Sequence, residues 1–168
     1  MRGAELLSWD PQAATIPPGE DAGPYNWISG YLRSIPRLVF PHSVDRSLLF
    51  VSPFLPFEYT GRGLRATIRH ASFASPSGVL KFELSFQRII VGTTNADSEV
   101  FGTVSAFDGS CSGQSGLIEE TTFDLADGNL IDDIERGDPF RVKLTRKGTD
   151  VGDTAERISF EGFFLDEL

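Results

Sequence analysis

Residues 80–87, with the sequence LKFELSFQ, alternate apolar and polar side chains at every position. In an extended chain the apolar members share one face and the polar members share the other. The apolar members are Leu80, Phe82, Leu84 and Phe86. A period of two predicts a β-strand with one buried and one solvated face, as in antiparallel sheets. We expect this strand to continue through residues 89–91, with a bulge near Arg88 where the alternation slips.

The same period recurs on both sides of this segment. It predicts further strands over residues 47–54, 64–70, 99–107, 117–123, 140–145 and 157–164. Segments rich in Gly, Pro, Ser and Asp separate them and predict turns, with one helical turn within 127–138. Frequent strands without a long period of 3.6 predict an all-β fold, and we expect an antiparallel jelly-roll sandwich of about eight strands.

The faces of the last predicted strand follow from the same alternation. Ile158, Phe160, Gly162 and Phe164 would point inward. Phe163 would then point outward, and it is the one strand aromatic that we expect to be exposed as a contact for another chain.

Residues 1–35 differ from the rest of the chain. They contain Pro17-Pro18, which favours an extended path, and no clear period. Yet they carry four large aromatic residues, which disordered tails seldom do. These are Trp9, Tyr25, Trp27 and Tyr31. We therefore divide the chain into an extended N-terminal arm (1–35), with a short helical turn near residues 26–33, and a sandwich domain (36–168). The arm would pack either on its own sandwich or on a neighbouring subunit.

Composition narrows the function. The formal charge of −9 would repel phosphates, so we expect no nucleic-acid partner. The chain has no apolar run long enough to span a membrane, and residues 1–15 lack the pattern of a signal peptide.

Few residues could support catalysis. Nucleophilic catalysis needs an oriented base, but the two histidines are separated and His70 lies on the inward face of a predicted strand. His42 follows Phe40-Pro41, and Cys111 lies in a Gly/Ser loop at 108–116 as a free thiol. We expect no enzyme activity and no zinc site from this set.

The acidic residues allow two weaker readings. Glu119 and Glu120 are adjacent on a strand and would point to opposite faces, and Asp132-Asp133 are typical of a solvated turn. The carboxylates of 124–129 and 150–153 could hold calcium, although neither segment matches an EF-hand and solvated turns are the favoured interpretation. We expect no metal and no cofactor.

Three stretches together resemble small virion proteins of tailed bacteriophages that act as decoration, cement or head-fibre proteins. The first is Trp9-Asp-Pro-Gln-Ala-Ala-Thr. The second is Leu55-Pro-Phe-Glu-Tyr-Thr-Gly-Arg-Gly-Leu64, with the strand, the Ser77-Gly78 turn and Phe82-Glu-Leu-Ser-Phe-Gln-Arg88 that follow it. The third is Gly137-Asp-Pro-Phe-Arg-Val-Lys-Leu-Thr-Arg146, with Asp153-Thr154 and a closing strand.

The resemblance implies a jelly-roll homotrimer that is assembled in the bacterial cytoplasm and binds the major capsid protein on the outer capsid surface. Trp9, Tyr25, Trp27 and Tyr31 would anchor the arm, so deleting residues 1–35 should abolish capsid binding or trimerisation and leave a folded sandwich. The alternative is a receptor- or carbohydrate-binding module of a phage tail fibre or baseplate, which would need exposed aromatic residues.

Overall fold

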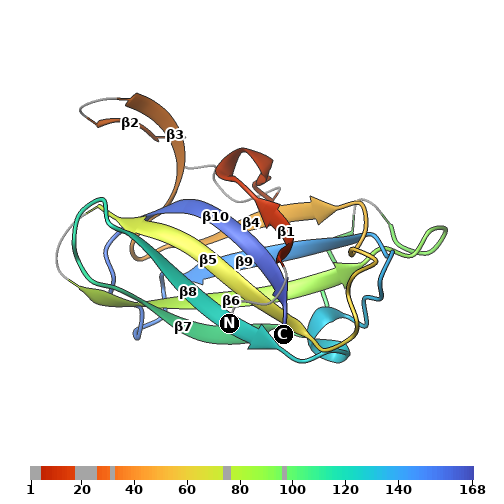
Figure 1. The fold of residues 1–168 in the computed structure, drawn as a ribbon. Coiled ribbons are helices and arrows are strands. Elements are labelled where there is room, and N and C mark those ends of the chain that lie inside the picture. Colours follow the sequence, from red (N-terminus) through yellow and green to blue (C-terminus); the bar gives the residue numbers. More distant parts are fainter. Residues whose placement is uncertain (1–4, 18–25, 31–32, 74–76, 96–97) are drawn as a thin grey trace.

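The computed structural model describes residues 5–17, 26–30, 33–73, 77–95 and 98–168, and only the backbone of residues 26–30 and 33–37. The described chain contains ten strands and two short 3₁₀ turns (Figure 1). The strands are β1 (Glu5–Trp9), β2 (Asn26–Gly30), β3 (Arg33–Phe40), β4 (Asp45–Ser52), β5 (Leu64–Ser72), β6 (Gly78–Arg88), β7 (Ser105–Cys111), β8 (Ile118–Leu125), β9 (Phe140–Lys147) and β10 (Ile158–Glu167). The turns are η1 (Pro11–Ala13) and η2 (Asn129–Ile131).

The strands form two antiparallel sheets. One has the order β2-β3-β10-β5-β8, with β1 also paired to β10, and the other has the order β4-β9-β6-β7. Most neighbours are distant in sequence, so the chain crosses repeatedly between the layers. The predicted all-β jelly-roll sandwich is confirmed.

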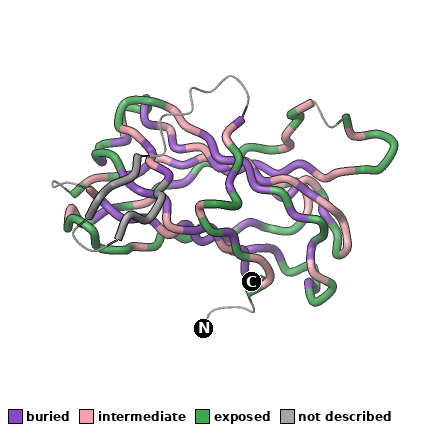
Figure 2. The backbone as a smooth tube through the Cα atoms, turned by 90° about the horizontal axis from the view of Figure 1, so that it is seen from above, coloured by how far each residue is buried: buried purple, intermediate pink, exposed green. Residues whose placement is uncertain are grey.

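Phenylalanine dominates the interior between the sheets. The rings without exposed surface include Phe50, Phe86, Phe140, Phe160 and Phe163. They contact one another stacked or tilted, for example Phe50 on Phe163 with centroids 5.2 Å apart. Figure 2 shows buried residues along the strands and exposed residues mainly in the connecting loops.

The strand of residues 80–87 is confirmed, but its expected continuation through residues 89–91 is wrong, and the next strand has other bounds than the expected 99–107. β6 stops at Arg88, and the chain turns at Ile90, whose carbonyl accepts from the Thr93 and Thr94 amides. β7 begins at Ser105, which pairs with Leu84 of β6, so the start of β7 is set by its pairing with β6 rather than by its own alternation. The predicted loop at 108–116 is wrong in its first half, because those residues continue β7.

Phe163 does not point outward, and that expectation is wrong. Between Phe160 and Gly162, β10 advances two residues while β5 advances one, which is a β-bulge. The extra residue reverses the alternation, so Phe163 is 0% exposed. Phe164 takes the outward position instead, and the guanidinium of Arg69 lies 4.5 Å above its ring.

Residues 5–17 pack on the chain's own sandwich, and we call them the N-terminal strap. β1 pairs with β10, placing Trp9 opposite Phe163 (Figure 1). Further on, Thr15 exchanges backbone hydrogen bonds of 2.8 and 2.7 Å with Leu49 of β4, in the other sheet. The strap therefore joins the two layers along one edge of the sandwich.

The rest of the arm is described only in part. Residues 26–30 form a strand paired with β3, so the expected helical turn near 26–33 is wrong there. β3 itself runs across the boundary at residue 35. Tyr25 and Tyr31 lie outside the described residues, as does the side chain of Trp27. Within the described chain, no helix has the length and apolar character needed to cross a membrane.

Candidate functional site

Three loops meet at one end of the sandwich, where β4 and β6 end and β9 begins (Figure 1). Backbone hydrogen bonds hold them together. Leu55 donates to Asp138 and accepts from Gly137, at 2.8 and 2.7 Å. On the other side, Ile89 donates to Pro139 at 2.9 Å. Residues 137–139 therefore lie between the loop after β4 and the loop after β6.

Exposed apolar side chains gather in these loops. Thirteen large hydrophobic residues of the described chain are exposed, and five of them lie within residues 54–57 and 90–100. We call these five the end surface: Phe54, Phe57, Ile90, Val91 and Val100. Phe54 and Phe57 each follow a proline, Pro53 and Pro56, in the loop after β4. Because loops lie at the surface, these Pro-Phe pairs could have indicated from the sequence that the two rings are exposed.

Phe57 is the most exposed aromatic of this group, at 70%. Its ring stacks against Phe54 with centroids 6.3 Å apart and an interplanar angle of 27°. A Cβ at Gly137 would lie 3.2 Å from Phe57 Cε1, and φ of Gly137 is +87°. The glycine thus admits both the left-handed turn and the ring above it.

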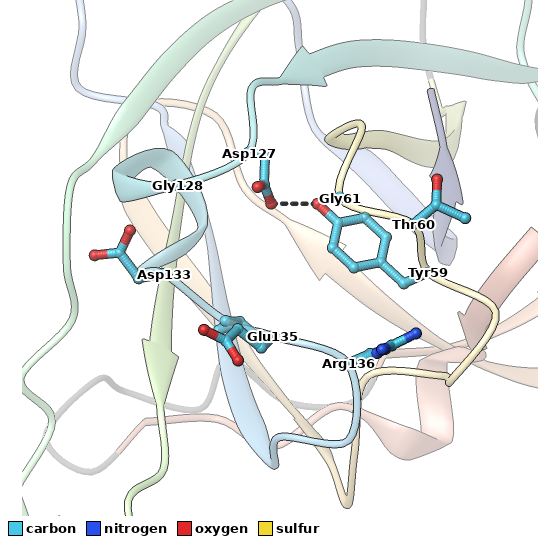
Figure 3. Close-up of a pocket in the computed structure, with 9 residues that line it drawn as sticks. Tyr59, Thr60, Gly61, Asp127, Gly128, Asp133, Glu135 and Arg136 are labelled. Atoms are coloured by element: carbon cyan, nitrogen blue, oxygen red, sulfur yellow. Dashed lines mark hydrogen bonds between the residues drawn. The ribbon is translucent and has the colours of Figure 1, made fainter.

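A pocket of about 400 Å³ lies between the loop after β4 and residues 127–136 (Figure 3). It is lined by Tyr59, Thr60, Gly61, Asp127, Gly128, Asp133, Ile134, Glu135 and Arg136. Figure 3 shows Glu135 and Arg136 on the same side of the Tyr59 ring, and the Asp133 carboxylate pointing away from that ring. Arg136 connects the pocket to the end surface, because it precedes Gly137 and bridges to Leu55.

Tyr59 is fixed at the back of this pocket. Its hydroxyl donates to Asp127 Oδ1 at 2.5 Å and accepts from the Gly63 amide at 3.2 Å. Burial, followed by the hydrogen bond to Asp127, raises the pKa of Tyr59 well above its usual range, so the hydroxyl stays protonated. Gly63 is required here, because its φ is +98° and a Cβ would lie 2.5 Å from the Leu125 carbonyl oxygen.

The pocket lining is acidic. Asp127, Asp133 and Glu135 contribute three negative charges and Arg136 one positive charge, a formal balance of −2 with Tyr59 neutral. Asp133 and its neighbour Asp132 have φ values of +51° and +57° at the end of η2. The site can therefore accept hydrogen bonds from a ligand and attract a cation.

The histidines and the cysteine lie on separate elements. His70 is on β5, fully buried, with Nε2 3.1 Å from Thr121 Oγ1. His42 lies in the turn after β3, with Nδ1 3.0 Å from the Ala155 carbonyl. Cys111 is buried at the end of β7, so its expected place in a loop is wrong. The structure does not bring these three together as a nucleophile and its base.

The acidic segments have structural partners. Glu120 pairs with Arg69 at 2.8 Å, whereas Glu119 accepts from the Ser112 amide at 3.0 Å. Asp132 accepts from the Arg88 amide at 2.7 Å, so it is more than a solvated turn residue. Asp133 is exposed.

The two segments considered for calcium are also engaged. Asp124 is held by Arg65 at 2.6 Å, and this hydrogen bond lowers the pKa of Asp124. Asp153 is buried against Arg146, and Asp150 accepts from the Gly152 amide. Among the residues that the structure describes, no group of three or more His, Cys, Asp or Glu side chains is placed to hold a metal ion.

Comparison with known proteins gives little further information. No protein-family model matches the chain, and no curated protein matches it. Among solved structures, the chain is similar to TmCBM61, determined in complex with β-1,4-galactotriose. The identity is 10% and the TM-score 0.37, over 99% of this chain and 91% of the other. A similarity this distant does not bear on the ligand of the present chain.

Proposed function

We propose that this protein is a structural component of a tailed-bacteriophage virion, which binds the major capsid protein on the outer surface of the capsid and stabilises the shell. It acts by binding, without catalysing a reaction, as a homotrimer assembled in the host cytoplasm. The three sequence stretches that resemble decoration proteins support this proposal, and two of them, at 55–64 and 137–146, begin in the loops of the end surface.

The end surface is the observation that carries the proposal. Within it, Phe54 and Phe57 stack as a pair of exposed rings, and exposed apolar patches on soluble proteins mark interaction sites. Stacked phenylalanines are suited to this role, because they bury a large area and have few torsions to restrict. Burying them against another protein would contribute roughly 25 cal/mol per Å² of apolar surface, before the cost of association.

This surface replaces part of the role expected of the arm. Trp9 is 9% exposed and packs in its own core, so it cannot anchor a neighbour while β1 is in place. The arm contributes to capsid binding through Tyr25, Trp27 and Tyr31.

Co-sedimentation tests the proposal directly. Purified protein at a series of concentrations would be mixed with capsids of the parent phage that were assembled without it. The capsids would then be pelleted and the bound protein measured. We expect saturable binding, and greater resistance of the decorated capsids to heat. Protein that stays in the supernatant at all concentrations would contradict a role on the capsid.

The pocket favours a second function, carbohydrate binding by a tail-fibre or baseplate module. Carboxylate oxygens of Asp127 and Glu135 can accept hydrogen bonds from sugar hydroxyls, and the exposed ring of Phe57 can cover the apolar face of a sugar. Calorimetric titration of the protein with a panel of neutral oligosaccharides tests this second function. Oligosaccharide binding should be lost in Phe57→Ala and kept in Val151→Ala. Equal heats of binding for the two variants would argue against this site.

A further inference from the structure

We propose that the end surface docks on a segment of the shell protein that combines apolar side chains with a lysine or arginine, and that this cationic side chain enters the pocket beside Tyr59. The inference rests on the proposed function and specifies the chemistry of the partner.

The geometry places an apolar and an acidic element side by side. The ring of Phe57 lies over Gly137, and Arg136, which precedes Gly137 in the sequence, lines the pocket. A partner that covers the stacked rings of Phe54 and Phe57 therefore comes close to the pocket, because the lining residues Tyr59 and Arg136 follow Phe57 by two residues and precede Gly137 by one. A partner segment that also covers the pocket must supply a counter-charge, because burying carboxylates without one is costly.

The charge of the pocket selects the partner. Its formal balance is −2, and Glu58 adds an exposed carboxylate beside Phe57. A second copy of this chain, presenting the same surface, would bring like charges together in a chain of formal charge −9. A basic segment is complementary to it. Asp127 and Glu135 supply acceptor oxygens for an ammonium or guanidinium group, and the Tyr59 ring supplies an aromatic wall.

Arg136 limits the geometry of docking. It is the one cation among the lining residues, and it would repel a second cation close to it. The entering group is therefore expected on the side of Asp127 and Glu135.

The apolar part is tested with Phe54→Ser/Phe57→Ser, in the capsid co-sedimentation assay with full-length protein. Both side chains are exposed, so the fold should be retained, which circular dichroism and melting temperature would verify. The matched control is Val151→Ser, at 90% exposed and on the turn at the opposite end of the sandwich. We expect affinity to fall roughly tenfold or more in the double variant and to stay unchanged in the control.

The charged part is tested with Glu135→Gln, which keeps the side-chain shape. Wild-type affinity should fall as NaCl is raised, and the variant should bind several-fold more weakly at low salt with a flatter salt dependence. Glu156→Gln, exposed near the other end, is the control and should behave as wild type.

The outcomes separate the two proposals. If wild-type protein does not bind capsids, the proposed function fails and this inference fails with it. If wild-type protein binds but Phe54→Ser/Phe57→Ser and Glu135→Gln both bind equally well, only this inference is overturned. If Phe54→Ser/Phe57→Ser instead changes the mass in solution, the occupant is a second copy and the basic partner is wrong.

Discussion

At the scale of single residues, Arg146 is the largest fully buried side chain of the described structure. Its Nε and Nη2 donate to both carboxylate oxygens of Asp153, at 3.0 and 2.6 Å. The remaining contacts are to the carbonyls of Phe40, Ala155 and Glu156, at 2.6 to 3.1 Å. One guanidinium therefore joins β9, the end of β3 and the segment before β10.

Replacing Arg146 should destabilise the fold strongly. Arg146→Met leaves Asp153 buried without a counter-charge, which costs about 3–5 kcal/mol in comparable pairs. Urea denaturation measures the free energy of unfolding. The surface variant Arg69→Met serves as a comparison and should lose much less, because exposed pairs contribute little. Equal losses of unfolding free energy in the two variants would show that the buried Arg146–Asp153 pair stabilises the fold no more than a surface pair does.

His70 should make stability depend on pH. Burial lowers its pKa from the ordinary value of 6.5, and Nδ1 has no hydrogen-bond partner in the described structure. The unfolded chain therefore binds a proton at pH values where the folded chain does not. Stability is then full above pH 6.5 and falls below it, by up to about 1.4 kcal/mol per pH unit, down to the folded-state pKa.

The variant His70→Gln tests this titration. It retains a polar group near Thr121 but cannot titrate, so its unfolding free energy should change less between pH 7 and pH 5. Denaturation curves at a series of pH values measure the difference. Parallel pH profiles for the two proteins would exclude His70 as the source.

At the scale of elements, the N-terminal strap is an integral part of the sandwich. Trp9 stacks on Phe163 at 5.5 Å, lies 5.7 Å from Phe50, and donates through Nε1 to the Val51 carbonyl at 3.3 Å. Trp9→Ala should therefore cost about 3–5 kcal/mol in unfolding free energy. Glu5→Ala, exposed on the same strand, is the control and should cost little. A small loss in Trp9→Ala would show that the strap adds no stability.

Deletion of residues 1–35 has a different expected result from the one that the sequence predicts. The deletion removes β1 from the edge of β10 and exposes the core around Phe163. We expect a chain with a lower melting temperature or no cooperative unfolding, rather than an intact sandwich. A cooperative transition at the wild-type temperature would restore the original prediction.

At the scale of the whole molecule, the proposed homotrimer predicts a mass in solution of three chains of 18.4 kDa each. Light scattering on a sizing column measures it without a shape assumption. A trimer would agree with a component of a symmetric shell. The mass of a single chain would contradict a trimer in solution. Capsid binding would then be decided by the co-sedimentation assay.

The sequence by itself determined the fold class, because a period of two is a local property of the chain. It was sufficient for residues 80–87 of β6, for the strands around 64–70 and 140–145, and for the burial of His70. It also placed a helical turn within 127–138, where η2 lies between the pocket-lining residues Gly128 and Asp133. Local alternation cannot reveal an extra residue in a strand, so the face of Phe163 was decided by the pairing of β10 with β5.

The tertiary structure alone decided where distant segments meet. Trp9 joins the core because β10 offers an edge more than 150 residues later, and Arg146 is buried because two separate segments, the end of β3 and residues 153–156, direct carbonyls or a carboxylate toward it. The end surface has the same origin. Phe57 and Ile90 come to one end of the sandwich through the segment 137–139 between their loops, and this pairing depends on contacts across the fold that no local pattern encodes.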